Sequence, residues 1–164
     1  IHTAEGAIIT SGSGDTYSFN TATALDAAFT IRTDVVFGTK GGDGTATARL
    51  ALGDSEQHPV GLITLKYDND KKLLVQGQYF YGGSWTTILA ADWKEIGTNH
   101  LVVTLSRAAG TNTLSLTIAK QDGTVVYGAT SGDIPAEALD TMTCYGVGSY
   151  SSQVQFTNVS YYAA

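Results

Sequence analysis

Turn-forming clusters of Gly, Asp, Asn and Ser interrupt this sequence at intervals of roughly 8–12 residues, and no other feature constrains the fold as much. Between the turns, runs rich in Thr, Val, Ile and aromatic residues alternate between apolar and polar positions, as in residues 27–37 and 45–53. Alternation with a period of two is the pattern of strands with one buried face. We expect about twelve strands, among them residues 6–10, 15–20 and 72–81, and one short helical turn within residues 133–139. The chain is therefore predicted to be all-β, an antiparallel β-sandwich of the jelly-roll kind.

Residues 76–93, QGQYFYGGSWTTILAADW, contain the clearest turn of the chain and both of its tryptophans, Trp85 and Trp93. The Gly82-Gly83 pair predicts a tight hairpin, because glycine adopts positive φ without steric cost. If these two glycines are the whole loop, the opposed residues are Tyr81–Ser84, Phe80–Trp85, Tyr79–Thr86, Gln78–Thr87 and Gln76–Leu89.

The two faces of this hairpin differ in character, since successive side chains of a strand point to opposite sides. One face is expected to point to the core, with Leu73, Val75, Gly77, Tyr79, Thr86, Ile88 and Ala90. The other face mixes polar and aromatic side chains, those of Gln76, Gln78, Phe80, Trp85 and Thr87. A mixed surface of this kind is unusual for a solvent-facing sheet and typical of a ligand platform.

Composition and charge exclude several classes of partner. The net charge is −6, and Lys71-Lys72 is the only cluster of basic residues, so the sequence lacks the basic patch of a nucleic-acid-binding protein. Binding to anionic membranes is disfavoured for the same reason, and no apolar run approaches transmembrane length. The single cysteine, Cys144, excludes an internal disulfide. We expect Cys144 to be a small buried apolar residue.

Four stretches carry a resemblance to a known superfamily. They are Glu5-Gly6-Ala7 before SGSG, FTIRTDVVF at Phe29–Phe37, GLITLKYDNDKKLLVQG at 61–77 with the following SWTTI, and YGVGS with VQFTNVSYY near the end. This pattern of strands and turns resembles the concanavalin-A-like lectin and glucanase superfamily, which includes laminin-G-like modules. Within it, the chain looks most like non-catalytic carbohydrate-binding modules of bacterial glycoside hydrolases, among them fructan binders and plant-wall binders.

The resemblance implies a polysaccharide ligand, a covalently linked catalytic domain in the parent protein and a secreted, extracellular location. Residues 1–164 are expected to form a single module. The sequence opens with IHTAEGAIIT, without an initiator methionine, and we expect the module to be excised from a larger protein.

Candidate ligand-binding residues follow from the strand faces. Planar amide, carboxylate and guanidinium groups suit sugar hydroxyls because they offer paired donors and acceptors. Aromatic rings can pack against the C–H face of a sugar. Trp93 lies in a predicted loop, where it is either a binding residue or a lid over the end of the sandwich, and we favour the lid. The alternative for the whole face is an ordinary solvated surface with cross-strand ion pairs. The predicted ligand-binding residues are Arg32, Asp34, Arg49, Gln76, Gln78, Phe80, Trp85 and Trp93. Arg32, Asp34 and Arg49 are expected to share one polar face with the hairpin.

The sequence contains only partial signals for a calcium site and for a catalytic site. Asp68-Asn69-Asp70 resembles a calcium loop, but three adjacent turn formers more often make only a turn, so any metal is left open. Glycosidases of this fold use two carboxylates on one face. The glutamates form no closely spaced run, Asp34 lacks an evident partner, and no strand shows the basic, Tyr and His set of a lyase.

We therefore predict no enzymatic activity and no cofactor. Two alternatives stay open. The first is a laminin-G-like domain for protein binding or adhesion. The second is a small glycosidase or polysaccharide lyase whose catalytic groups come from distant strands.

Overall fold

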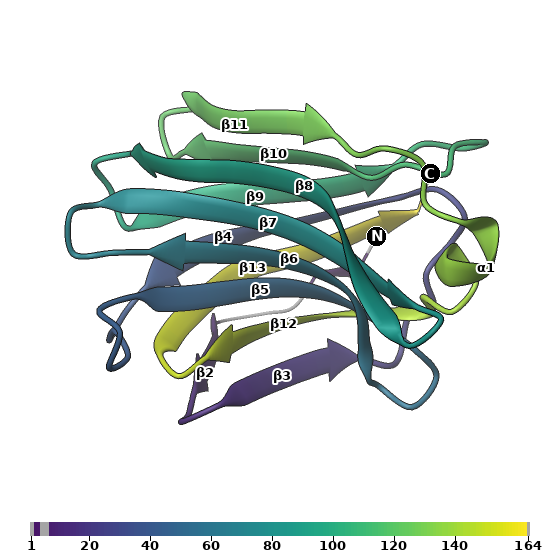
Figure 1. Cartoon of the computed structure of the whole chain (residues 1–164), viewed down its shortest axis with the longest axis horizontal. Coiled ribbons are helices and arrows are strands. Elements are labelled where there is room, and N and C mark those ends of the chain that lie inside the picture. Colours follow the sequence, from purple (N-terminus) through teal and green to yellow (C-terminus); the bar gives the residue numbers. More distant parts are fainter. Residues whose placement is uncertain (1, 4–6, 164) are drawn as a thin grey trace.

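The computed structural model describes residues 2–3 and 7–163. Two antiparallel sheets pack face to face, which confirms the predicted all-β sandwich (Figure 1). Sheet A runs in the order β1 (His2–Thr3), β13 (Gln153–Ala163), β4 (Phe29–Phe37), β9 (His100–Arg107), β10 (Ser115–Lys120) and β11 (Val125–Thr130), and β2 (Ala7–Ser11) also pairs with β13. Sheet B runs in the order β3 (Asp15–Asn20), β12 (Cys144–Tyr150), β5 (Ala46–Gly53), β6 (Pro59–Tyr67), β7 (Lys72–Tyr81) and β8 (Ser84–Glu95).

The core lies between the two sheets and is built from the alternating apolar positions. The inner face of sheet A supplies Ile31, Val35, Leu101, Leu105 and Ile118, and that of sheet B supplies Leu50, Leu65, Val75 and Val147. Burying one such side chain stabilises the fold by roughly 1.5–3 kcal/mol. The predicted helical turn is present as α1 (Ala136–Leu139), and its residues Ala138 and Leu139 are buried. Within the described ranges, no helix is long and apolar enough to cross a membrane.

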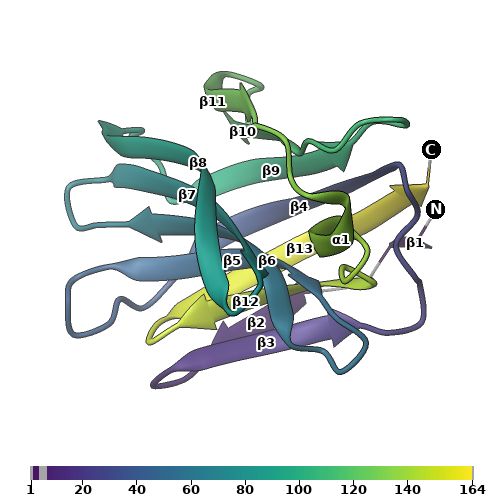
Figure 2. The same cartoon turned by 45° about the vertical axis from the view of Figure 1, so that its right-hand side comes forward.

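The β7–β8 hairpin forms around Gly82 and Gly83, whose φ angles are 63° and 84°. The predicted partners hold from Tyr81–Ser84 to Gln78–Thr87. In Figures 1 and 2 the hairpin bends out of sheet B, and its tip lies in front of the sheet near the end that carries α1.

Beyond Gln78 the predicted register is wrong, because a register shift lies between Gly77 and Gln78. Gly77 pairs with Leu89, which is 5% exposed, and Gln76 pairs with Ala90. A side chain at Gly77 would sit 3.0 Å from the Leu89 Cβ. Leu89 thus occupies the inner position opposite Gly77 that the predicted register assigned to Ile88, and Gly77 leaves room for it because it has no side chain.

Two further expectations concern the ends of elements. The loop predicted around Trp93 is wrong, since β8 continues to Glu95. A second register shift, between Leu73 and Val75, places one extra residue in β8. The extra residue interrupts the alternation of apolar and polar positions, so the sequence pattern indicates a loop where the strand continues. The predicted first strand begins with Gly6, and the Glu5-Gly6-Ala7 stretch begins with Glu5; both of these residues lie outside the described residues.

Candidate functional site

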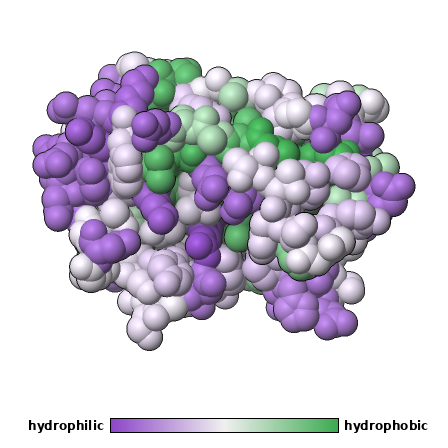
Figure 3. Space-filling view, in the orientation of Figure 1, coloured by the Kyte–Doolittle hydropathy of each residue, from purple (hydrophilic) through white to green (hydrophobic). Residues whose placement is uncertain are grey.

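The outer face of sheet B brings polar and aromatic side chains into rows across the strands. Cross-strand pairing aligns one row as Tyr17, Gly148, Arg49, Thr64, Gln76 and Ala90. The neighbouring row is Phe19, Gly146, Ala51, Leu62, Gln78 and Thr87. Figure 3 looks onto this side of the molecule and shows apolar patches set among hydrophilic surface. Of the predicted ligand-binding residues, six lie on this face, and their contact with a ligand stays a prediction: Arg49, Gln76, Gln78, Phe80, Trp85 and Trp93.

Arg49 is the most constrained of these side chains. Its guanidinium forms an ion pair with Asp15, donates a hydrogen bond of 3.0 Å to the Tyr17 hydroxyl and lies 5.4 Å from the centre of the Tyr150 ring. Only 18% of the side chain is exposed. The Arg49 Nε–H is buried and has no hydrogen-bond partner among the described residues. The geometry thus presents a planar cation whose position is fixed by Asp15, Tyr17 and Tyr150.

The Tyr17 hydroxyl beside Arg49 keeps its proton at neutral pH. Burial raises the pKa of Tyr17 above its ordinary value, and this effect outweighs the opposite influence of the Arg49 charge and hydrogen bond. Tyr17 is therefore a neutral hydrogen-bonding group rather than a phenolate in the physiological range.

Two outward-facing glycines of β12 let aromatic rings lie flat over the sheet. A Cβ on Gly148 would be 2.5 Å from the Tyr17 Cδ1 and 2.5 Å from the Thr16 carbonyl oxygen. A Cβ on Gly146 would be 2.7 Å from the Phe19 Cδ1. The two rings stack on each other with centroids 5.7 Å apart. The alternate glycines therefore create a flat aromatic surface beside Arg49.

Phe80 and Trp85 form a second aromatic group near the hairpin tip. Their ring centroids lie 5.3 Å apart at an angle of 51°, and Trp85 is 40% exposed. Gln78 donates a weak hydrogen bond of 3.4 Å to the Thr87 hydroxyl. The outer face of sheet B thus carries aromatic rings at both of its edges, on β3 and on the β7–β8 hairpin.

Arg32 and Asp34 do not belong to this face, which corrects the prediction that they share it with Arg49. Both lie on β4 in sheet A, and they point to the outside of the opposite sheet. Asp34 accepts a hydrogen bond of 2.7 Å from Asn158 and lies 3.4 Å from the His100 Nε2. Alternation correctly identified the polar side of β4, but it carries no information on which sheet a strand joins.

Trp93 lies on β8, eight positions after Trp85, and is 39% exposed. Because Lys94 is opposite the inward Leu73, alternation places Trp93 on the outer side of sheet B. It is therefore a residue of the edge strand, far along β8 from the hairpin tip, and the expected lid over the end of the sandwich is not formed by a loop.

Sequence reasoning missed Asp15, Tyr17 and Phe19 as site residues. The sequence does contain a pattern that indicates them. Asp15, Tyr17 and Phe19 occupy alternate positions of DTYSFN, and glycines occupy alternate positions of YGVGSY in the strand β12 that pairs with β3. Aromatic residues on one strand opposite glycines on the next indicate rings that lie across the neighbouring strand. Tyr150 joins the same group through its contact with Arg49.

Asp68-Asn69-Asp70 forms a turn that accounts for its sequence. The Asp68 carboxylate accepts hydrogen bonds of 2.9 Å from the backbone N–H groups of Asp70 and Lys72. In the part of the chain that the structure describes, no three His, Cys, Asp or Glu side chains are grouped so as to hold a metal ion.

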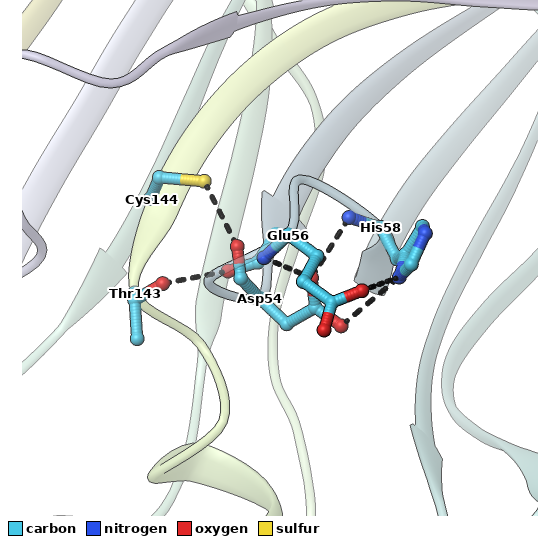
Figure 4. A network of polar contacts seen from close by, with 6 residues as sticks. Asp54, Glu56, His58, Thr143 and Cys144 are labelled. Carbon is cyan, nitrogen blue, oxygen red and sulfur yellow. Dashed lines mark hydrogen bonds and ion pairs between the residues drawn. The ribbon is translucent and has the colours of Figure 1, made fainter.

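Asp54 organises the loop between β5 and β6 in the same manner (Figure 4). Its Oδ1 accepts hydrogen bonds of 2.9 Å from the backbone N–H groups of Glu56 and His58, and these hold the pKa of Asp54 below its ordinary value. Cys144 lies beside this loop, with its Sγ 3.7 Å from the Asp54 carbonyl oxygen. Cys144 is 7% exposed and burial raises the pKa of its thiol, in keeping with the expected apolar role.

Comparisons with known proteins identify solved structures that share this fold. No protein-family model and no curated protein matches the sequence. Carbohydrate-binding module CBM66 from Bacillus subtilis matches with a TM-score of 0.65 at 15% identity, over 94% of this chain and 86% of that chain. The CBM2 module of the evolved Dit protein of Lactobacillus casei BL23 phage J-1 matches with a TM-score of 0.67 at 10% identity, over 96% and 76%.

A polysaccharide lyase family 18 domain, aly-SJ02, also matches, with a TM-score of 0.55 at 12% identity, over 97% of this chain and 88% of that chain. The chain therefore has the concanavalin-A-like jelly-roll fold, as the sequence resemblance predicted. At these identities the likeness shows the fold alone.

Proposed function

We propose that this chain is a non-catalytic carbohydrate-binding module that holds a polysaccharide on the outer face of sheet B. The observation that carries the proposal is Arg49, fixed by Asp15, Tyr17 and Tyr150 beside the flat rings of Tyr17 and Phe19. A sugar ring has hydroxyl groups at its rim and an apolar C–H face. The guanidinium suits the former, and the aromatic rings suit the latter.

The fold supports this proposal without deciding it. Two of the similar structures carry names of carbohydrate-binding modules, and a third carries the name of a polysaccharide lyase. One fold hosts several functions, so the residues of the site carry the argument. We further propose that the module belongs to a secreted bacterial protein and directs a linked catalytic domain to its polysaccharide.

A polysaccharide lyase is the second candidate, and one observation favours it. Arg49 and the Tyr17 hydroxyl lie 3.0 Å apart on one sheet face, which is a basic and tyrosine pair assembled from distant strands. The raised pKa of Tyr17 speaks for binding, because a general base must lose its proton near the operating pH. A lyase would release unsaturated oligosaccharides from a polyuronate, which ultraviolet absorbance detects.

Affinity electrophoresis against β-glucan, mannan, xylan, levan and alginate tests the proposal. We expect retardation by at least one of these polysaccharides and no release of reducing sugar or unsaturated product. Migration unchanged in every gel would contradict carbohydrate binding and favour the protein-binding alternative. Product release that Tyr17→Phe abolishes would replace the module by a lyase.

A further inference from the structure

A cavity of about 400 Å³ lies at the α1 end of sheet B, beneath the tip of the β7–β8 hairpin. Its walls come from three segments: the hairpin tip, the loop after β5 and the segment that follows α1. The lining residues include Val60, Phe80, Tyr81, Ser55, Asp140 and Thr143. This volume is within the range of small-ligand pockets, and Arg49 is not among the lining residues.

The cavity continues the outer face of sheet B. Phe80 belongs to both, because it pairs with Trp85 on the outer face and also lines the cavity. The hairpin tip also contributes Tyr81 and Gly82 to the lining. A ligand on the Arg49 face can therefore extend into the cavity past the Phe80 ring.

The lining has one apolar and one polar side. Val60, Phe80 and Tyr81 supply an apolar and aromatic wall, while Ser55, Thr141 and Thr143 supply hydroxyl groups. The carboxylates of Asp54 and Asp140 also line the cavity, and its lining holds no Lys or Arg side chain among the described residues. Asp54 is ionised and already accepts backbone N–H groups.

The charge of the lining residues favours a neutral ligand. A negatively charged sugar is disfavoured, because it would face carboxylates without a cation to compensate them. A neutral sugar ring fits, since its hydroxyl groups can donate to Asp140 and exchange hydrogen bonds with the hydroxyl side chains while its C–H face packs on Phe80 or Tyr81.

We propose that this cavity is a second subsite, which takes one neutral sugar unit of the polysaccharide held on the Arg49 face. The proposal rests on the carbohydrate-binding function proposed above and adds to it a position and a charge preference. The hairpin tip, which bends out of sheet B (Figure 2), contributes Phe80, Tyr81 and Gly82 to the lining of this subsite.

Filling the cavity tests the subsite. Ser55 is exposed at its rim, so Ser55→Trp is expected to block it without disturbing the core. Thr104→Trp adds the same bulk on the outer face of sheet A and serves as the matched control. Tyr81→Ala, which removes a wall rather than filling the space, is a second variant in case Ser55→Trp is unstable.

Calorimetric titration would compare these proteins and Arg49→Ala, using oligosaccharides of increasing length from β-glucan, mannan, xylan, levan and alginate. We expect Ser55→Trp to abolish an affinity gain on the order of tenfold that longer neutral chains show with the wild type. Tyr81→Ala should reduce this gain, and Thr104→Trp should retain it.

The outcomes separate the two proposals. Full retention of the gain in Ser55→Trp and Tyr81→Ala, with binding lost in Arg49→Ala, would overturn the subsite and leave the Arg49 face standing. Alginate oligosaccharides that gain affinity through the cavity as neutral ones do would overturn the charge preference. Failure of every oligosaccharide to bind the wild type would overturn the carbohydrate-binding function and the subsite with it.

Discussion

Replacing Arg49 by alanine is expected to weaken polysaccharide binding by roughly 10- to 100-fold, the effect of removing a central, well-packed contact residue. The variant loses the planar donor at the centre of the face and the group that holds Tyr17 and Tyr150 in place. Affinity electrophoresis or calorimetry measures the loss. The fold should survive, because the side chain lies outside the core and its partner Asp15 is about half exposed.

The chain supplies a matched control for this variant. Arg32 lies on the outer face of sheet A, on the opposite side of the sandwich. Arg32→Ala removes the same group and should leave binding unchanged. Arg49→Lys should restore binding only in part, since lysine keeps the charge without the planar guanidinium. Equal losses from Arg32→Ala and Arg49→Ala would point to a general effect of charge and count against the site.

Placing a methyl group at Gly148 is expected to lower the free energy of unfolding by roughly 1–3 kcal/mol, the usual cost of overpacking. The new Cβ would lie 2.5 Å from the Thr16 carbonyl oxygen, so the backbone of β3 must shift. It would also displace the Tyr17 ring from its position beside Arg49. Gly148→Ala should thus reduce both stability, measured by denaturant unfolding, and binding.

Gly128 provides the comparison, because it is also a glycine within a strand. A Cβ there has the Val125 Cγ1 at 3.9 Å as its nearest neighbour, an ordinary contact distance. Gly128→Ala should change stability by no more than about 0.5 kcal/mol. If Gly148→Ala is as stable as Gly128→Ala, the ring of Tyr17 does not pack against Gly148 of β12.

Local features of the fold were predictable from the sequence. The bounds of β3 and β7 agree with the expected strands, and the Gly82-Gly83 turn has the expected register at its tip. These features depend on neighbours in sequence: alternation assigns a side chain to one side of its strand, and two glycines determine a turn. The residues that the β7–β8 hairpin contributes to the candidate site could be predicted from these local features.

Features that depend on distant residues were not predictable in the same way. Arg32 and Asp34 were placed on the wrong face because alternation cannot tell sheet A from sheet B. The pairing of Gln76 failed because Leu89 fills the space beside Gly77, a contact between strands. Tyr17 belongs to the site because it pairs with Gly148, which has no side chain and lies more than a hundred positions further along the chain. Each miss concerns packing across strands rather than a propensity.

A nitrogen-15 NMR titration with the polysaccharide fragment that binds tests the central claim most directly. The Arg49 Nε–H, buried and without a hydrogen-bond partner in the described part of the chain, has its own resonance. We predict that this resonance shifts on titration, together with the backbone amides of β5 and β12. Shifts confined to β4 and β9, around Arg32, Asp34 and His100, would contradict the claim by placing the ligand on sheet A.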